Sequence, residues 1–469
     1  MRALSATCTH LGAPLGEGIA VNGEVHCPWH HARFSVVTGE ATGAPAFAAL
    51  TRFGTTVRDG RVFVTESSAP TAAPTAIPAA GRVVIVGAGA AGHACAQLLG
   101  RSGYRAPVTV ISDDLDPPYD RTFCSKQYLI GMKSRQDSLI ADSAQYRNDS
   151  KSGPTLRLGC KVHALNVQRK FILLEGDEQV DFDVLVLATG AEPKRPRWPG
   201  SDLPNVHVLR TLRDADAIIQ GSEGARQVAV IGSSFIGLEA AASLRQRQLN
   251  VRVVTPEAVP LEKLLGSDVG KIIQEVHQEK GVRFHFGREV KQYDGKKLIL
   301  DDDSVVEADF VVLGIGVTPR TEIAAAAGLD CAPPDQGAGV IVSERLETSV
   351  PGIFAVGDIA RYPDPHSGER IRVEHWVHAQ RQGQHVARVI MGQASRYRDL
   401  PFFWSAHFDT GLRYLGHVGS ITDVQTEGSI EGRNFSRLQS GRGRQKAYVT
   451  CNRDKASLLK EAEWDAAVR

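Results

Sequence analysis

Two stretches of this chain share one pattern, in which a buried strand runs into a glycine-rich turn and then into a helix. The first is RVVIVGAGAAGHACAQLL, at 82–99. Its glycines, in the order G-x-G-x-x-G, are Gly87, Gly89 and Gly92. The first glycine makes the turn, the second lets the backbone approach a pyrophosphate, and the third permits close helix–strand packing. The next strand ends at Asp113, suitably placed for a pair of ribose hydroxyls. This stretch therefore predicts a dinucleotide site.

The second stretch, QVAVIGSSFIGLEAAASL at 227–244, keeps Gly232 and Gly237 but has Ser234 in place of the middle glycine. Serine is the smallest replacement for glycine here, and we expect it to weaken the fit to a pyrophosphate. The following strand leads to Glu257, near the ribose. Because no arginine follows at once to pair with a 2′-phosphate, NADH is favoured over NADPH.

Two such domains in one chain usually mean FAD in the first and NAD(P)H in the second, and two further stretches favour FAD. In DVLVLATGAEPKRP, a strand runs into Thr189 and Gly190. In TSVPGIFAVGDIARY, a strand ends at Gly357 and Asp358, where a carboxylate is able to accept hydrogen bonds from ribityl hydroxyls. The alternative role for Asp358 is the N-cap of a helix.

The start of the chain carries a different signal, CTHLGAPLGEGIAVNGEVHCPWHH at 8–31. It has the pattern C-x-H-x16-C-x2-H, made by Cys8, His10, Cys27 and His30. A two-iron cluster of the Rieske type needs two thiolates on one iron and two imidazoles on the other, and two such loops supply that set. Hairpin turns are predicted at Asn22-Gly23 and Asp59-Gly60.

The alternatives are a zinc site or a chance pattern, but zinc spacings usually pair cysteine with cysteine and histidine with histidine. His26 and His31 are not expected to be ligands. His31 stands where a small residue is usual in this motif, so we expect it to crowd or tune the cluster. The loops lack the second cysteine pair of respiratory Rieske proteins. The potential should therefore lie toward the lower end of the roughly −150 to +300 mV Rieske range.

Residues 66–80 are predicted to be a linker because Pro70, Pro74 and Pro78 rule out a regular helix or central strand. Extended, the linker spans roughly 45 Å, enough to let a small head dock in more than one place. Only seven residues precede Cys8, so we expect a start further upstream or a truncated head. The predicted domains are a Rieske domain at 1–65, an FAD-binding domain at 81–198 and 333–398, an NAD-binding domain at 199–332 and a C-terminal interface domain at 399–469.

The expected fold class is multidomain. A small all-β Rieske domain precedes tandem α/β Rossmann-type domains of the glutathione-reductase kind, and an α+β C-terminal domain follows. With 54 basic and 53 acidic residues, no global field points to nucleic acid or a membrane surface. No signal peptide and no membrane-spanning apolar run are found. Seven cysteines in such a chain are expected to be free thiols or metal ligands, which favours a cytoplasmic location.

On these motifs the chain resembles the two-dinucleotide flavoprotein family, which includes the ferredoxin reductases of bacterial oxygenase systems and the apoptosis-inducing factors. Its head makes it most similar to the apoptosis-inducing-factor-like proteins that carry a Rieske domain. The resemblance covers essentially the whole chain from residue 5 to about residue 460. Its specific marks are CTHLGAPL, CPWHHARF, IGSSFIGLE, GIGVTPRTE, EHWVHAQRQG and PFFWSAHF.

The resemblance implies roles for individual residues. PPYDRTFCSK matches the flavin-contacting segment, with Arg121 and Lys126 at the isoalloxazine side. Glu239 would pair with Lys126 close to flavin N5, where the nicotinamide stacks, and these two are the predicted catalytic residues. Trp404 would approach the flavin from the C-terminal domain. The further expected cofactor contacts are Gly316, Glu374, His375 and Trp376. For Trp376 and Trp404 the alternative is core packing.

The cysteines outside the N-terminal motif also bear on the chemistry. Cys124 replaces a usual leucine of the flavin segment and is expected near the flavin as a lone thiol. The chain has no C-x4-C pair in the first flavin helix region, so disulfide-reductase chemistry has no machinery here. The remaining cysteines, expected to be buried packing residues, are Cys95, Cys160, Cys331 and Cys451.

The resemblance implies an NADH-dependent electron-transfer enzyme of the ferredoxin-reductase type. Electrons would pass from NADH to FAD, then to a [2Fe-2S] cluster, and then to an external redox protein such as an oxygenase component. A homodimer, in which the head serves the other subunit, is an open alternative. So are a redox-sensing flavoprotein whose oligomeric state responds to NADH, and a flavin reductase or NADH oxidase with a non-functional head.

Overall fold

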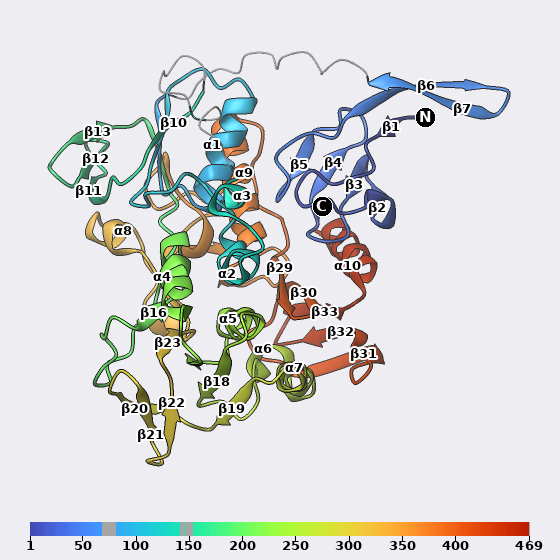
Figure 1. Ribbon diagram of the computed structural model, residues 1–469. Coiled ribbons are helices and arrows are strands. Elements are labelled where there is room, and N and C mark those ends of the chain that lie inside the picture. Colours follow the sequence, from blue (N-terminus) through green and yellow to red (C-terminus); the bar gives the residue numbers. More distant parts are fainter. Residues whose placement is uncertain (68–80, 141–145, 147–152, 469) are drawn as a thin grey trace.

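The structure is a computed structural model that describes residues 1–67, 81–140, 146 and 153–468 (Figure 1). Most of the predicted linker therefore lies outside the described residues, and strand β7 continues to Ser67, two residues into the predicted linker. The predicted domain boundaries remain predictions. None of the described helices has the length and apolar character needed to cross a membrane.

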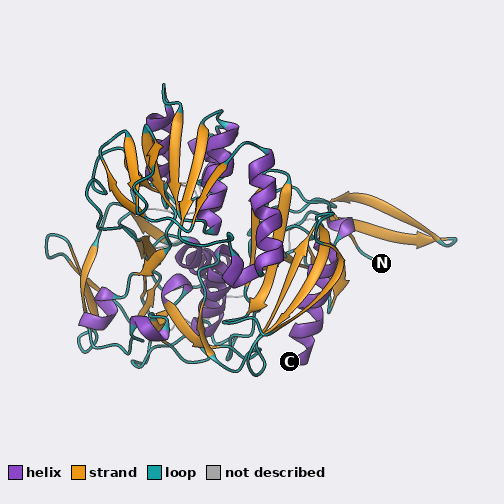
Figure 2. Ribbon diagram, turned by 90° about the horizontal axis from the view of Figure 1, so that it is seen from below, coloured by secondary structure: helices purple, strands orange, loops and turns teal. Residues whose placement is uncertain are grey.

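The head is built from two antiparallel sheets, in the orders β2-β3-β4-β5 and β1-β6-β7. The strands are β1 Ala3–Leu4, β2 Ile19–Val21, β3 Glu24–His26, β4 Arg33–Ser35, β5 Ala41–Gly43, β6 Arg52–Arg58 and β7 Arg61–Ser67. Both predicted hairpin turns are confirmed, since Asn22-Gly23 joins β2 to β3 and Asp59-Gly60 joins β6 to β7 with positive φ at all four residues. The β6–β7 hairpin projects from the molecule (Figures 1 and 2).

Two parallel five-stranded sheets follow, and each contains one of the strand–turn–helix patterns. The first has the order β10-β9-β8-β14-β26, with β8 Val83–Val86, β9 Val108–Ile111, β10 Thr155–Arg157, β14 Val184–Leu187 and β26 Ile353–Ala355. The second has the order β16-β23-β17-β18-β19, with β16 Val206–Val208, β17 Gln227–Ile231, β18 Asn250–Thr255, β19 Arg283–Phe286 and β23 Phe310–Leu313. All four residues of β8, and all of β17 except its first, are buried, which explains their continuous apolar sequence.

Helices flank these sheets, and α1 and α9 pack against each other (Figure 1). The longer helices are α1 Ala90–Arg101, α4 Leu212–Ser222, α5 Phe235–Gln246, α7 Ser267–Glu279 and α9 Trp376–Ile390. The short ones are α2 Gln127–Ile130, α3 Arg135–Ser138, α6 Glu262–Leu265 and α8 Glu322–Ala326. Four small sheets complete this part of the fold. The first contains β11 Val162–Asn166, β12 Phe171–Leu174 and β13 Gln179–Asp181, and the second contains β15 Ala191–Pro193 and β24 Val317–Pro319. The third contains β20 Val290–Tyr293, β21 Lys297–Leu300 and β22 Val305–Glu307, and the fourth contains β25 Val340–Ile341, β27 Ala360–Pro363 and β28 Arg370–Arg372.

The C-terminal part is an antiparallel sheet in the order β29-β30-β33-β32-β31, followed by helix α10 Asp454–Ala467. Its strands are β29 Phe402–His407, β30 Thr410–His417, β31 Asp423–Ser429, β32 Asn434–Ser440 and β33 Lys446–Cys451. Helix α10 contacts β30 and β33 of this sheet and β2 of the head (Figure 1). The C-terminal helix therefore packs against the N-terminal head.

Candidate functional site

In the first glycine turn, Gly87 and Gly92 are closely packed, whereas Gly89 borders open space. A Cβ on Gly87 would lie 2.2 Å from the Ala188 oxygen, and a Cβ on Gly92 would lie 1.9 Å from the Gly87 oxygen, so neither position admits a side chain. Gly89 is the N-cap of α1, and a Cβ there would meet only Arg121 Nη2, at 4.0 Å. The turn thus leaves a space at a helix N-terminus beside a guanidinium group, as the pyrophosphate of FAD requires.

Two arginines that the sequence analysis missed line this region. Arg210 Nη2 donates to Asp358 Oδ2 at 2.6 Å, and Arg320 Nη1 donates to Asp113 Oδ2 at 2.9 Å. Asp358 is buried and is not the N-cap of the following long helix, because that position belongs to His375. Arg210 lies two residues beyond the end of β16, at the edge where ligands of α/β sheets bind, and Arg320 directly follows β24. No motif marks either arginine.

Three other residues predicted to contact FAD, Thr189, Gly190 and Gly357, lie close to these arginines or to α1. Thr189 Oγ1 donates to the Arg320 oxygen at 2.7 Å. A Cβ on Gly190 would be 3.5 Å from Arg210 Nη2, and one on Gly357 would be 3.3 Å from the Ala91 side chain. The loops that carry these residues therefore converge on the N-terminal end of α1.

In the second glycine turn, Ser234 is the N-cap of α5. Its Oγ accepts a hydrogen bond from Gly237 N at 3.2 Å and donates one to the Gly314 oxygen at 2.7 Å. The serine is therefore part of the turn rather than only a flaw in the motif. A Cβ on Gly232 would lie 2.5 Å from the Gly314 oxygen, whereas Gly316 faces open space. Glu257 accepts hydrogen bonds from Thr255 and Ser233.

The two predicted catalytic residues form an ion pair between the domains. Lys126 Nζ lies 2.6 Å from Glu239 Oε2 on α5. Ser125 donates to the same oxygen at 2.6 Å, and Ser405 of β29 donates to Glu239 Oε1 at 2.7 Å. Glu239 is buried, and both of its oxygens are hydrogen-bonded, so the carboxylate is held in one orientation.

Near this pair, Cys124 is buried, and burial raises the pKa of its thiol to about 12. It is therefore an unreactive thiol at neutral pH. All seven cysteines are free, and Cys160 and Cys331 are only half-buried, contrary to the expectation that they are fully buried.

The EHW segment begins α9. Glu374 pairs with Arg372 at 2.6 Å and is exposed. The His375 ring lies 4.4 Å from that of Phe403, and burial lowers its pKa well below the usual value. Trp376 and Trp404 are half-buried and pack against the cluster of Val377, Leu400, Phe402 and Leu415, so core packing accounts for part of their role.

The four predicted iron ligands come together in the order a Rieske cluster needs. The Cys8 thiol donates to the sulfur of Cys27, and the rings of His10 and His30 lie 5.0 Å apart. This hydrogen bond, with backbone N–H groups of the second loop, lowers the pKa of Cys27 to about 7. The buried Nδ1 of His10 has no hydrogen-bond partner, as expected of a nitrogen reserved for a metal. The residues therefore fit two sulfurs on one iron and two imidazoles on the other.

A zinc ion would need all four ligands around one point. Among the described residues, no three histidine, cysteine, aspartate or glutamate side chains are grouped so as to hold a single metal ion.

The imidazole ligands face the flavin side of the molecule. His30 lies with its ring centre 4.1 Å from the ring of Trp404, and His10 Nε2 lies 3.6 Å from Asp120 Oδ2 in the flavin segment. A cleft of about 370 Å³ lies between the head and the rest of the chain, and its lining includes His30, Trp404 and Lys126. The predicted cluster site, the C-terminal sheet and Lys126 of the predicted catalytic pair thus border one space.

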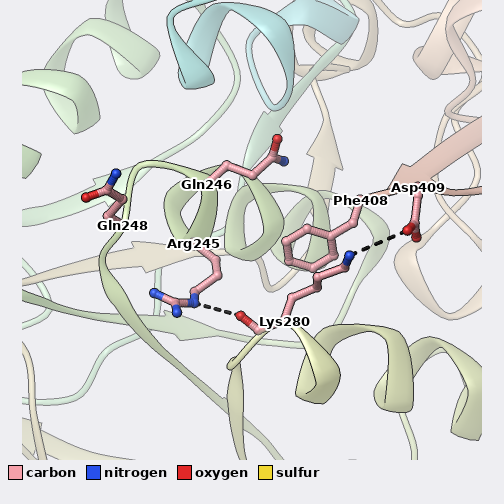
Figure 3. Close-up of a pocket in the computed structure, with 6 residues that line it drawn as sticks. All are labelled: Arg245, Gln246, Gln248, Lys280, Phe408 and Asp409. Carbon is pink, nitrogen blue, oxygen red and sulfur yellow. Dashed lines mark hydrogen bonds and ion pairs between the residues drawn. The ribbon is translucent and has the colours of Figure 1, made fainter.

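A second surface cavity, of about 490 Å³, lies around Arg245, Gln246, Gln248, Lys280, Phe408 and Asp409 (Figure 3). Lys280 Nζ is 3.5 Å from Asp409 Oδ2, and Arg245 donates to the Lys280 oxygen at 2.7 Å. None of the predicted site residues lines it. It adjoins the cleft through Phe408 and Asp409, which line both.

Polar contacts hold the head in this position. The hydrogen-bonded pairs include Ala44 N with Gln384 Oε1 at 3.0 Å, Arg388 Nη2 with the Thr42 oxygen at 2.6 Å, and Arg101 Nη2 with the Ala41 oxygen at 2.7 Å. His31, which we expected to crowd or tune the cluster, instead points to Glu461 of α10, with Nδ1 2.7 Å from Oε2. In this structure the head is therefore docked on α1, α9 and α10.

Comparisons with known proteins agree with this architecture. Residues 81–383 match the family described as pyridine nucleotide-disulphide oxidoreductase, and residues 1–54 match the Rieske [2Fe-2S] domain. Apoptosis-inducing factor 3 of Homo sapiens is 30% identical over 452 residues, which is 92% of this chain and 73% of that protein. The ferredoxin–NAD(+) reductase component of the anthranilate 1,2-dioxygenase system of Burkholderia cepacia is 35% identical over 341 residues, 72% of this chain and 82% of that protein.

Among solved structures, the covalent putidaredoxin reductase–putidaredoxin complex superimposes with a TM-score of 0.77 at 28% identity, over 83% of this chain and 94% of that chain. The resemblance, the multidomain fold class, the oxidoreductase assignment and the cofactors FAD, NAD(H) and [2Fe-2S] predicted from the sequence are confirmed by these matches. The roles of the individual site residues stay predictions.

Proposed function

Because this chain belongs to the pyridine nucleotide-disulphide oxidoreductase family and carries a Rieske domain, we propose that it passes electrons from NADH, through FAD and its own cluster, to an external redox protein. The observation that carries the proposal is the 4.1 Å separation of the His30 and Trp404 rings, beside a cleft that also reaches Lys126. The head lies where a ligand of the cluster faces the flavin segment.

When bound, the flavin supplies the change from paired to single electrons. The chain's own residues would position the nicotinamide and the flavin ring. Lys126 and Glu239 hold opposite charges 2.6 Å apart, and Ser125 and Ser405 fix the orientation of the carboxylate. A nicotinamide and a flavin ring stacked there would meet a preorganised, nearly neutral polar wall.

The acceptor is proposed to be a redox protein such as an oxygenase component. The Burkholderia cepacia relative is named as the ferredoxin–NAD(+) reductase of a dioxygenase system, and the solved complex pairs a reductase with putidaredoxin. In this chain the head would replace the separate ferredoxin. A cytoplasmic setting and NADH as the donor belong to the same proposal, supported by seven free thiols and by Glu257 beside the second glycine turn.

The test is an anaerobic titration of the holoenzyme with NADH, followed by visible and EPR spectroscopy. We expect flavin bleaching and a rhombic EPR signal from the reduced cluster. His30→Ala should remove the cluster signal and spare flavin reduction by NADH. Iron-loaded protein in which NADH reduces the flavin but never the cluster would contradict the proposal.

A second candidate function is supported by the similarity to apoptosis-inducing factor 3 over 92% of this chain. In this alternative, NADH binding changes the oligomeric state and turnover is incidental. Steady-state cytochrome c reduction, together with molar mass measured with and without NADH, separates the two. Rapid turnover at constant mass supports electron transfer, whereas slow flavin reduction with a change from monomer to homodimer supports sensing.

A further inference from the structure

The two ligand loops of the head have the same backbone. In the first, Cys8 N donates to the Ala13 oxygen at 2.8 Å and Gly12 N donates to the Cys8 oxygen at 3.0 Å. In the second, Cys27 N donates to the Ala32 oxygen at 2.8 Å and His31 N donates to the Cys27 oxygen at 3.2 Å. Gly12 and His31 therefore occupy equivalent positions.

Both positions have a left-handed backbone, with φ +80° at Gly12 and +59° at His31. Glycine adopts this conformation without steric cost, whereas a residue with a Cβ does not. The chain follows this rule in its first loop and departs from it in its second. A strained residue beside a ligand is expected to persist only when its side chain gains something from its surroundings.

The His31 side chain makes its contacts outside the head. Its Nδ1 lies 2.7 Å from Glu461 Oε2 of α10, and its ring stacks on Phe402 with centres 3.9 Å apart and planes at 20°. Its backbone oxygen accepts from Arg381 Nη2 of α9 at 3.1 Å. The imidazole is 0% exposed. One residue of the head thus contacts three elements of the reductase.

Glu461 is the centre of a buried ionic network. Its Oε1 accepts from Arg381 Nη1 at 2.6 Å and from Arg33 Nη2 of the head at 3.0 Å. Arg33 also pairs with Asp399 at 3.0 Å and with Asp465 at 3.3 Å. Buried charges are costly unless all their partners are in place, so this network favours one docked geometry over a head that is partly displaced.

We propose that His31 is a positioning residue that clamps the second ligand loop to the reductase, so that electrons pass between flavin and cluster within one docked chain. The proposal rests on the proposed function. His31 directly follows His30 in the chain, so a movement of His31 would also displace His30, whose ring lies 4.1 Å from that of Trp404. With the clamp in place, the head does not need to diffuse toward the flavin for each electron transfer, because the cluster is held at a fixed distance from it.

The experiment compares three variants of the holoenzyme. His31→Gly removes the clamp and restores the residue that the backbone prefers, so the loop remains able to hold the cluster. Glu461→Gln removes the charge from the other side of the contact, at a residue of α10 that is far from the ligands in the sequence. His26→Gln is the matched control, because His26 is a buried, non-ligand histidine whose 3.5 Å ion-pair partner, Glu24, lies within the head.

Three readouts are needed: cluster content by EPR after dithionite, the stopped-flow rate of cluster reduction by NADH, and the radius of gyration by small-angle scattering. In His31→Gly we expect a loaded cluster, unchanged NADH-to-ferricyanide turnover at the flavin, a larger radius and a cluster reduction rate lowered by about tenfold or more, since the docked fraction falls. Glu461→Gln should change in the same direction, and His26→Gln should match the wild type.

Unchanged radius and unchanged cluster reduction in His31→Gly and Glu461→Gln would overturn the proposal. Loss of the cluster from His31→Gly would also overturn it, because His31 would then shape the loop rather than the docking. If NADH fails to reduce the cluster even in the wild type, the proposed function fails. Scattering would still report whether the clamp holds the head, so the two failures are distinguishable.

Discussion

The two glycine turns of this protein have nearly the same backbone and differ in what their middle residue does. Gly87 and Gly232 have φ of +106° and +96°, and each turn leads into a helix of 12 residues. The N-caps, Gly89 and Ser234, both have an extended backbone. At Gly89 a side chain would meet almost nothing, whereas the Ser234 hydroxyl accepts from Gly237 N of α5 and donates to the Gly314 oxygen beyond β23.

This difference separates two requirements that one motif combines. The first and third glycines serve the packing of strand, turn and helix, since a Cβ on either would contact backbone in both copies. The middle residue either leaves space for the ligand, as Gly89 does, or caps the helix, as Ser234 does. An open position leaves the N–H groups of the helix to a phosphate, and a serine takes up one of them itself.

The largest expected effect comes from the third glycine. In Gly92→Ala the added carbon would lie 1.9 Å from the Gly87 oxygen, and in Gly237→Ala it would lie 2.5 Å from the Gly232 oxygen. We expect Gly92→Ala to destabilise its domain by about 4 kcal/mol or more and Gly237→Ala by less. Thermal unfolding monitored by flavin release and by circular dichroism measures both. Equal melting temperatures for the two variants and the wild type would contradict the packing argument.

The next effect depends on the residue after the third glycine, which is His93 in one turn and Leu238 in the other. Burial lowers the pKa of His93 to about 4, so between pH 6.5 and 4 the unfolded chain binds a proton that the folded chain does not. Stability should fall as the pH falls through this window, with a contribution of about 3 kcal/mol.

The His93→Leu variant copies the second turn into the first. Its loss of stability between pH 6.5 and pH 4 should be smaller than that of the wild type, although the hydroxyl of Tyr146, 2.7 Å from His93 Nδ1, loses a partner. Unfolding curves at several pH values give both slopes. Other buried histidines, such as His407, titrate in both proteins and cancel in the difference. Identical slopes would show that His93 does not carry this dependence.

A smaller effect is expected from Gly89→Ser, which gives the first turn the cap of the second. The backbone at Gly89, with φ −72°, accepts a side chain. The new hydroxyl would bond to the helix N-terminus and compete with a phosphate there, so FAD should bind about tenfold more weakly, or about 1.4 kcal/mol. Flavin release during dialysis measures the change, and unaltered retention would count against the division of roles.

The smallest effect is expected at Ser234. Ser234→Ala leaves the Gly237 N–H and the Gly314 oxygen without the serine hydroxyl, and should cost about 1 kcal/mol, as for other helix caps. Ser234→Gly should cost a few tenths of a kcal/mol and should bind NADH at least as tightly as the wild type. NADH affinity, measured by flavin quenching, checks the second statement, and weaker binding in Ser234→Gly would mean that the hydroxyl contacts the dinucleotide.

Patterns over a few residues predicted much of the fold. The strand, turn and helix of both dinucleotide sites, the two head hairpins and the pairing of thiols and imidazoles all follow from local spacing and backbone preference. The same reasoning missed Arg210 and Arg320, because their partners Asp358 and Asp113 lie far away in the chain. It also did not predict that Ser234 caps α5, because the pattern considers the phosphate and not the helix cap; the weaker fit to a pyrophosphate stays a prediction.

The sequence by itself predicted most of the candidate residues for FAD, NADH and the two irons, since those groups need particular residues at particular spacings on local backbone. Only the tertiary structure decided where the head lies and why its second loop carries His31 instead of glycine. The partner, Glu461, is 430 positions away. Its contact depends on the packing of α10 between two domains, and no local pattern of residues encodes that arrangement.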